Sequence, residues 1–161
     1  MRLYLLRHGI AEEWRPDFPD EKRRLTAEGK RKVRLIAQGI SKLDLGLDLI
    51  FTSPLPRASE TAEIVADVLG CKELVNVDDR LAGGFSLHGA RGIISDAGSA
   101  QSVMLVGHEP GFSMVASSLT GGSQIDLKKG GLIRIDTDEI APGLGVLKWL
   151  LAPAIFVEEQ S

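Results

Sequence analysis

The sequence predicts an α/β fold of three layers, in which a mostly parallel, mixed sheet of five to six strands carries helices on both faces. Short apolar runs alternate along the chain with stretches of helical periodicity, which is the pattern of an α/β layer fold. The early runs are apolar at nearly every position, as expected of parallel strands buried between two helix layers. The chain shows no internal repeat or linker, so residues 1–161 are predicted to form a single domain.

Six apolar runs are predicted as strands: residues 3–6, 49–51, 73–77, 103–106, 132–135 and 146–151. The last two are separated only by the polar stretch 137–143, which favours a hairpin. The final strand is therefore expected to be antiparallel, which makes the sheet a mixed one.

Helical periodicity follows three of these strands clearly. Thr26 is a predicted N-cap with Glu28 in the first turn, and one face of the helix that follows carries Val33, Ile36, Ala37, Ile40 and Leu43. Two more helices are predicted to begin near Pro56 and after Pro110. A weaker pattern over residues 86–97 indicates a fourth. Residues 15–24 are densely charged and broken by proline, and are expected to form a loop over the strand ends.

The composition excludes several classes of function. A net charge of -3 argues against general nucleic-acid binding, which requires a basic face. Cys71 is the only cysteine, which excludes an intramolecular disulfide and fits a reducing cytoplasm. The N-terminal apolar run is too short for a signal peptide, and no run approaches the ~20 residues that span a bilayer. We therefore expect a cytoplasmic protein with neither a membrane nor a nucleic-acid partner.

Two of the three histidines follow apolar strands at equivalent positions. His8 and His108 each stand two residues beyond a predicted strand, over residues 3–6 and 103–106. If these strands are parallel neighbours, both imidazoles emerge at the edge of the sheet where open α/β sheets bind their ligands. A neutral His8 can attack phosphorus and carry the phosphoryl group covalently, while His108 stabilises the developing charge. The competing interpretations are a strand-capping His8 and a helix-capping His108.

Two arginines are candidates to bind the phosphoryl oxygens. A guanidinium presents a planar fork of donors that matches phosphate and stays charged. Arg7 precedes His8, and Arg57 lies in the first turn of a predicted helix, where its charge opposes the helix dipole unless an anion binds there. Otherwise Arg57 is a surface residue. Gly9 permits a close backbone approach at this turn.

Other residues carry less information. No His-x-His, His-Glu-x-x-His or Cys-x-x-Cys pattern occurs, so a metal site is not predicted. His88 follows no apolar strand and is interpreted as a loop residue.

Three motifs together resemble those of the histidine phosphatase superfamily, also called the phosphoglycerate mutase-like superfamily. They are Arg7-His8-Gly9, the stretch over residues 53–62 that contains Arg57, and Gly107-His108. The chain is most similar to the small SixA-type branch of phosphohistidine phosphatases. That similarity rests on Ala11 after the first motif, the pattern over residues 20–29, and the stretches 107–110 and 130–132. It spans nearly the whole chain.

The resemblance implies a phosphoglycerate mutase-like fold with His8 as the phosphorylated nucleophile. Arg7, Arg57 and His108 would complete the phosphate pocket, and neither a metal nor another cofactor would be needed. Arg23 and Arg24 would reach the pocket from the charged loop. An ion pair between Arg23 and Asp20 explains Arg23 equally well.

One departure from the superfamily pattern bears on the substrate. Members that act on phosphate esters carry a glutamate general acid after the third strand, where this chain has Asp78-Asp79-Arg80. Losing a proton donor for an alkoxide costs ~10²–10⁴-fold, whereas the imidazole of phosphohistidine is a far less basic leaving group. Asp78, Asp79 and Glu109 remain possible substitutes for the missing acid.

The leading hypothesis is a metal-independent phosphatase that removes phosphate from phosphohistidine in a partner protein, such as a histidine-containing phosphotransfer domain or a phosphocarrier. Inorganic phosphate would also bind in the pocket. A small-molecule phosphomonoesterase or phosphoglycerate mutase-like enzyme is the alternative. A non-catalytic phosphate-binding module would not require the nucleophile. A domain whose histidines are only structural is the simplest remaining interpretation.

Overall fold

A computed structural model describes residues 1–157 and contains one sheet in the strand order β3-β2-β4-β1-β5-β6. The strands are β1 (Arg2–Arg7), β2 (Leu49–Thr52), β3 (Val75–Val77), β4 (Ser102–Gly107), β5 (Leu132–Asp136) and β6 (Val146–Leu151). The first four are parallel to one another, whereas β5 is antiparallel to both β1 and β6. The predicted hairpin and mixed sheet are therefore confirmed. The chain reverses direction before β5 and again before β6. Strand β5 therefore runs opposite to the four parallel strands, and β6 runs in the same direction as they do.

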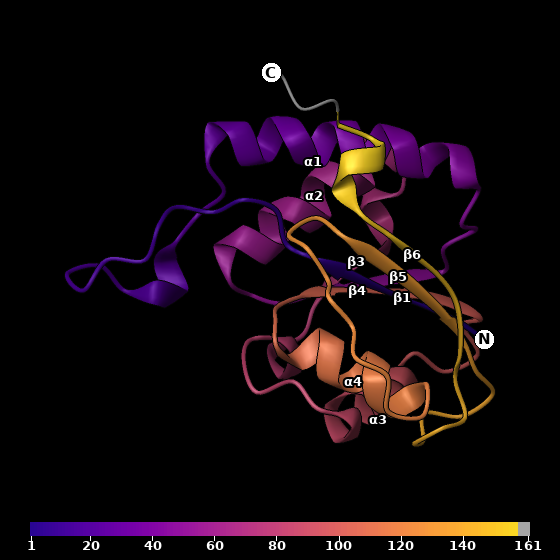
Figure 1. Cartoon of the computed structure of the whole chain (residues 1–161). Coiled ribbons are helices and arrows are strands. Elements are labelled where there is room, and N and C mark those ends of the chain that lie inside the picture. Colours follow the sequence, from indigo (N-terminus) through magenta and orange to yellow (C-terminus); the bar gives the residue numbers. More distant parts are fainter. Residues whose placement is uncertain (158–161) are drawn as a thin grey trace.

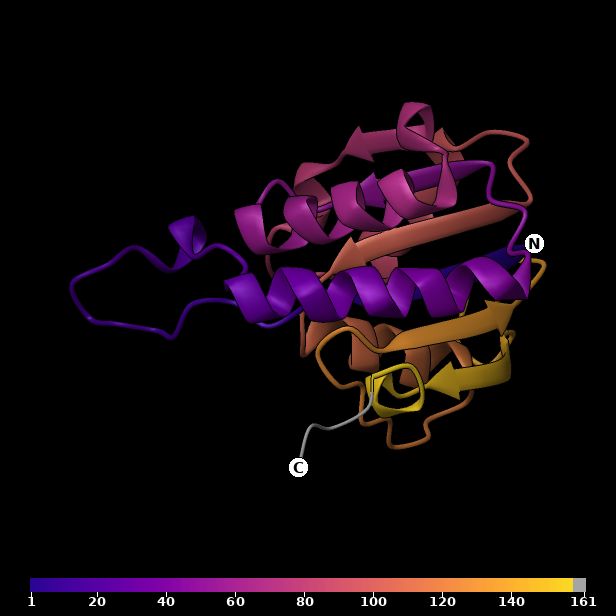
Figure 2. The same cartoon turned by 90° about the horizontal axis from the view of Figure 1, so that it is seen from above.

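Helices cover both faces of the sheet, as Figures 1 and 2 show. Helices α1 (Ala27–Ile40) and α2 (Pro56–Leu69) lie on one face, and α3 (Leu87–Asp96) and α4 (Gly111–Leu119) lie on the other. Side chains of β1 alternate between the two cores: Tyr4 and Leu6 pack with α1 and α2, and Leu3 and Leu5 pack with α3 and α4. The three-layer prediction is confirmed. Among residues 1–157, no helix combines the length and apolar character needed to cross a bilayer.

The start of α1 is held close to the segment that leaves β1. Thr26 is the N-cap, and its side chain accepts a hydrogen bond of 2.9 Å from the Gly29 amide, as the sequence predicted. A Cβ at Gly29 would stand only 2.0 Å from the Ile10 carbonyl oxygen, and one at Gly9 would stand 2.4 Å from Val33. These glycines let the turn after β1 lie directly against the helix.

Two predicted boundaries are wrong, both because a tight 3-10 turn intervenes. Strand β3 begins at Val75 because residues 72–74 form a 3-10 turn, closed by a Leu74 amide that donates to the Cys71 carbonyl at 3.0 Å. Helix α1 likewise ends at Ile40 and passes into a 3-10 turn. Because a 3-10 turn has three residues rather than 3.6, Leu43 rotates off the buried face and is 42% exposed. His88 lies in the first turn of α3 and not in a loop.

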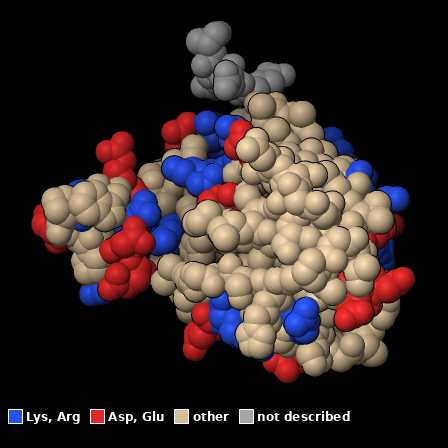
Figure 3. Space-filling view, turned by 60° about the horizontal axis from the view of Figure 1, so that its bottom comes forward, with Lys and Arg blue, Asp and Glu red and all other residues tan. Residues whose placement is uncertain are grey.

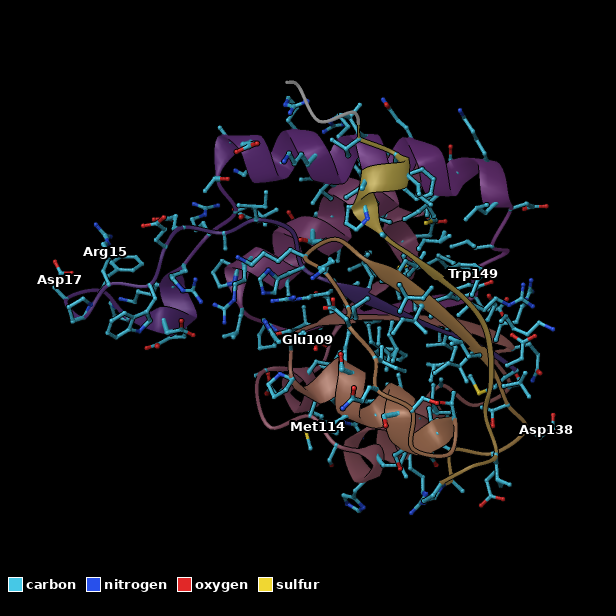
Figure 4. The ribbon with its side chains drawn as sticks, in the orientation of Figure 1. Arg15, Asp17, Glu109, Met114, Asp138 and Trp149 are labelled. Atoms are coloured by element: carbon cyan, nitrogen blue, oxygen red, sulfur yellow. The ribbon has the colours of Figure 1, made fainter. Side chains whose placement is uncertain are left out.

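The charged loop over residues 15–24 only partly matches its prediction. Its tip projects away from the body of the protein, and Figure 4 shows Arg15 and Asp17 there. Only the part from Asp20 onward returns to the strand ends, in a short 3-10 turn. Figure 3 shows acidic and basic side chains crowded on this projection, and Trp14 beside it is 64% exposed.

Candidate active site

The two histidines meet because β1 and β4 are parallel neighbours in register. Arg7 lies opposite Gly107 in the sheet, so His8 and His108 follow the two strands side by side at their carboxyl ends. Their ring centroids are 5.2 Å apart, with the ring planes inclined by 56°. The His8 amide also donates to the Gly107 carbonyl at 3.0 Å, which ties the two turns together. The structure thus joins two histidines that are far apart in the chain.

Hydrogen bonding fixes which nitrogen of His8 carries the proton. Nδ1 lies 2.7 Å from the carbonyl oxygen of Gly9, which can only accept, so Nδ1 is the protonated nitrogen. The lone pair is therefore on Nε2. Burial, followed by the nearby His108 and the charges of Arg57 and Arg7, lowers the pKa of His8 to about 3. His8 is thus a neutral imidazole whose nucleophilic atom is Nε2.

His108 is held by a serine from the neighbouring strand end. Its Nε2 lies 2.8 Å from Oγ of Ser53, the residue directly after β2. Its Nδ1 is buried and has no hydrogen-bond partner among the described residues. Burial, followed by the charge of Arg57, lowers the pKa of His108 to about 4. Sequence reasoning assigned no role to Ser53, although it belongs to the same motif as Arg57.

Both candidate arginines keep part of their guanidinium without a partner. Nη1 of Arg7 donates to the Leu127 carbonyl at 2.8 Å. Nη1 and Nη2 of Arg57 contact the carbonyl and carboxylate oxygens of Asp20 at 2.8 and 3.1 Å. The Nε–H groups of both arginines are buried with no partner among the described residues. An unpaired buried donor costs about 1–3 kcal/mol, so both sites fit an anion that would accept these bonds.

A buried threonine connects these groups. Oγ1 of Thr61 accepts from the Gly9 amide at 3.1 Å and donates to the Arg57 carbonyl at 2.7 Å. It therefore fixes the turn after His8 against the first turn of α2. Sequence reasoning assigned no role to Thr61. Its signal was its place in the motif over residues 53–62, one helical turn beyond Arg57.

The two arginines of the charged loop have different surroundings. Arg23 pairs with Asp20 at 2.8 Å, and its charge still contributes to the lowered pKa of His108. The ion pair that its sequence allowed is therefore present, and a role of Arg23 in binding phosphate stays a prediction. Arg24 instead pairs with the buried Glu60 at 2.6 Å, and its side chain is 65% exposed. Arg24 is therefore a partner of Glu60. It lies outside the histidine–arginine cluster, which consists of Arg7, His8, Arg57 and His108.

The comparisons with known proteins assign the family. The model of "Histidine phosphatase superfamily (branch 1)" matches residues 3–83, and an uncharacterized protein of Picosynechococcus sp. is 34% identical over 142 residues, which cover 83% of each chain. The chain belongs to the histidine phosphatase superfamily. The resemblance stated from the motifs is therefore confirmed, and members of this superfamily are phosphatases and mutases.

Solved structures agree with this assignment. A protein from Agrobacterium tumefaciens described as the phosphohistidine phosphatase SixA is 25% identical, with a TM-score of 0.80 over 94% of this chain and 97% of that one. The protein histidine phosphatase SixA complexed with tungstate is 23% identical and shares the fold, with a TM-score of 0.85 over 96% and 99%. A protein from Escherichia coli described as an α-ribazole-5'-P phosphatase has a TM-score of 0.73 at 21% identity, over 98% and 100%. The fold thus occurs in phosphatases named for different substrates.

Asp78 and Glu109, two of the three residues considered as a general acid, are each engaged by another side chain. Hydrogen bonds from Arg80 lower the pKa of Asp78 and keep it ionised. Glu109 accepts from the amide and hydroxyl of Ser113 in α4. Within residues 1–157, no group of three or more His, Cys, Asp or Glu side chains is placed to hold a metal ion.

The lowered pKa of His8 gives a testable pH dependence of stability. The native state binds fewer protons than the unfolded state between pH 6.5 and about 3, so acid favours unfolding over this range. His8 alone is expected to reduce the free energy of unfolding by up to about 1.4 kcal/mol per pH unit. Denaturant unfolding at pH 6.5 and 5 should show a smaller pH dependence in His8→Asn than in the unaltered protein. An equal dependence in both would show that His8 titrates normally.

Proposed function

We propose that this histidine phosphatase hydrolyses phosphohistidine in a protein substrate, with His8 as the nucleophile. The observation that carries the proposal is the meeting of two neutral imidazoles, with ring centroids 5.2 Å apart, beside two guanidiniums whose Nε–H groups are buried and unpaired among the described residues. Arg7 and Arg57 would hold the phosphoryl oxygens, Gly9 would bring the backbone close, and Arg23 would contribute charge from the margin. His108 would stabilise the transferring group.

The proposed cycle has two displacements at phosphorus. Nε2 of His8 forms a bond to phosphorus as the substrate's N–P bond breaks, and the leaving imidazole keeps that electron pair. Water then forms an O–P bond as the bond to His8 breaks. The water proton passes to the phosphate, and His8 recovers its lone pair while Nδ1 stays bonded to Gly9. Neither step requires a metal or another cofactor.

The arrangement of the acids supports a phosphoramidate over an ester. An alkoxide needs a proton as it leaves, whereas an imidazole protonated on its other nitrogen leaves as a neutral ring. Asp78 is held ionised by Arg80, and Glu109 is engaged by Ser113. A small-molecule phosphomonoesterase is the alternative, and the substrate comparison below distinguishes it.

Two further parts of the proposal concern the whole chain. We propose that residues 1–161 are one histidine phosphatase domain, because the described strands form a single sheet with a core on each face. The similarity to proteins named SixA supports a phosphorylated protein as the partner. A phosphotransfer domain or phosphocarrier has the required chemistry, and inorganic phosphate would bind as the product.

The test compares a phosphohistidine protein with an aryl phosphate, both in the presence of a metal chelator. We expect kcat/KM to favour phosphohistidine by about 10²-fold or more, and mass spectrometry of quenched enzyme to locate phosphate on His8. An equal or greater kcat/KM for the aryl phosphate would favour the phosphomonoesterase. Turnover lost to the chelator, or phosphate carried on another residue, would contradict the mechanism.

A further inference from the structure

A cavity of about 240 Å³ opens beside His108, and nothing in the proposed cycle yet uses it. We call it the side cavity. Two segments face each other across it: residues 81–86, which lead into α3, and residues 108–114, which lead into α4. His108 belongs both to the cluster with His8 and to the wall of this cavity, so the cavity borders the candidate active site.

The wall of the side cavity is apolar with one acidic group. Leu81 and Phe85 are almost fully buried beneath it, and Met114 is exposed at its opening. Glu109 is the acidic member, and Figure 4 shows Glu109 and Met114 at the N-terminal end of α4. None of the lining residues is lysine or arginine. An anionic group such as a second phosphate or a carboxylate would therefore be unfavourable here, whereas a neutral or cationic ring would be favoured.

We propose that the side cavity receives the imidazole ring of the phosphohistidine substrate, with Glu109 stabilising the cationic form of that ring. This inference rests on the proposed function and identifies the part of the site that selects the leaving group. The size agrees, because pockets for drug-sized molecules begin near 300 Å³ and a single five-membered ring is much smaller. A phosphoryl group bound beside His108 would therefore have this cavity as its neighbour.

The chemistry of the first displacement explains why the charge of Glu109 matters. The ring leaves as neutral imidazole only if its other nitrogen already carries a proton, so the reactive substrate is a phosphorylated imidazolium. A carboxylate beside the ring favours that cation. The titratable residues that line the cavity are His108 and Glu109, and His108, with a pKa of about 4, is neutral at pH 6–8. Glu109 is then the charge that the ring meets.

The first test fills the cavity from Gly83. A Cβ at Gly83 has no heavy atom within 4 Å, so a larger side chain fits without displacing the fold. The probes are phosphoimidazole, which carries the ring, and phosphoramidate, which has a P–N bond without it. We expect Gly83→Leu to lower the ratio of their kcat/KM values by about tenfold or more, and the matched Gly83→Ala to lower it much less.

The second test removes the charge. Gln in place of Glu109 can still accept from the Ser113 amide through its oxygen, and its NH2 group can donate to the Ser113 hydroxyl. Since the carboxylate raises the pKa of the bound ring, Glu109→Gln should lower kcat for phosphoimidazole about tenfold at pH 8 and less at pH 6. Glu139→Gln is the control, because Glu139 is exposed in the β5–β6 connection beside Asp138, far from the site in Figure 4. It should leave both values unchanged.

The outcomes of these tests distinguish a failure of this inference from a failure of the proposed function. A substrate ratio unchanged in Gly83→Leu, or an equal loss at both pH values in Glu109→Gln, would overturn the assignment of the cavity while the enzyme remained a phosphatase. If the unaltered protein hydrolyses neither probe and carries no phosphate on His8, the proposed function fails and the inference falls with it. A lowered ratio together with a larger loss at pH 8 would support the assignment.

Discussion

Replacing His8 by alanine is expected to reduce turnover of phosphohistidine by about 10⁴-fold or more while inorganic phosphate still binds. The loss is large because Nε2 of His8 is the atom that would form the bond to phosphorus, and no other side chain can replace it at that point. Phosphate binding should persist because Arg7, Arg57 and His108 remain. Steady-state kinetics and calorimetric titration with phosphate measure the two effects separately.

A matched histidine provides the control for this substitution. His88 is exposed in the first turn of α3 and does not line the cluster, so His88→Ala should keep the kcat/KM of the unaltered protein. Undiminished turnover in His8→Ala would remove His8 from the mechanism. Loss of phosphate binding along with turnover would instead mean that the substitution had disturbed the pocket as a whole.

The part of the site that could be predicted from the sequence is the part that lies next to strand ends. An apolar run followed by Arg7-His8, and another followed by His108, suffices to place both imidazoles at a sheet edge. The assumption that the two strands are neighbours is met by the pairing of β1 with β4. Helix starts at Thr26 and Pro56 are equally local, since capping and the fixed φ of proline act within one turn.

What could not be predicted depends on side chains brought together by the fold. The Leu127 carbonyl that accepts a hydrogen bond from Arg7 lies 120 residues away in the sequence. The Asp20 carboxylate that accepts from Arg57 comes from the charged loop, only part of which lies over the strand ends as predicted. The side cavity likewise forms only when the segments before α3 and α4 face each other. The predicted burial of Leu43 was wrong because helical periodicity does not reveal where a helix tightens into a 3-10 turn.

The Arg57→Lys substitution is expected to reduce kcat/KM for phosphohistidine by about 10²-fold, although it preserves a positive charge. The Arg57 side chain is buried, and its two terminal nitrogens already meet Asp20 while Nε points its hydrogen at no described partner. A lysine offers one compact ammonium in place of this planar fork, so it cannot bond to Asp20 and to two phosphoryl oxygens in the same geometry.

The pH dependence of this variant distinguishes lost geometry from lost charge. Burial lowers the pKa of Arg57 itself, but a guanidinium begins so high that it stays protonated. An ammonium in the same buried position begins lower and is expected to lose its proton at moderately alkaline pH, so the defect should widen from pH 7 to pH 9.

Arg24→Lys is the matched control, since that exposed side chain pairs with Glu60 outside the cluster and should keep kcat/KM within about twofold. A loss of kcat/KM in Arg57→Lys that stays constant with pH would attribute the loss to geometry alone. A kcat/KM equal to that of the unaltered protein would show that phosphate does not need the planar fork of Arg57.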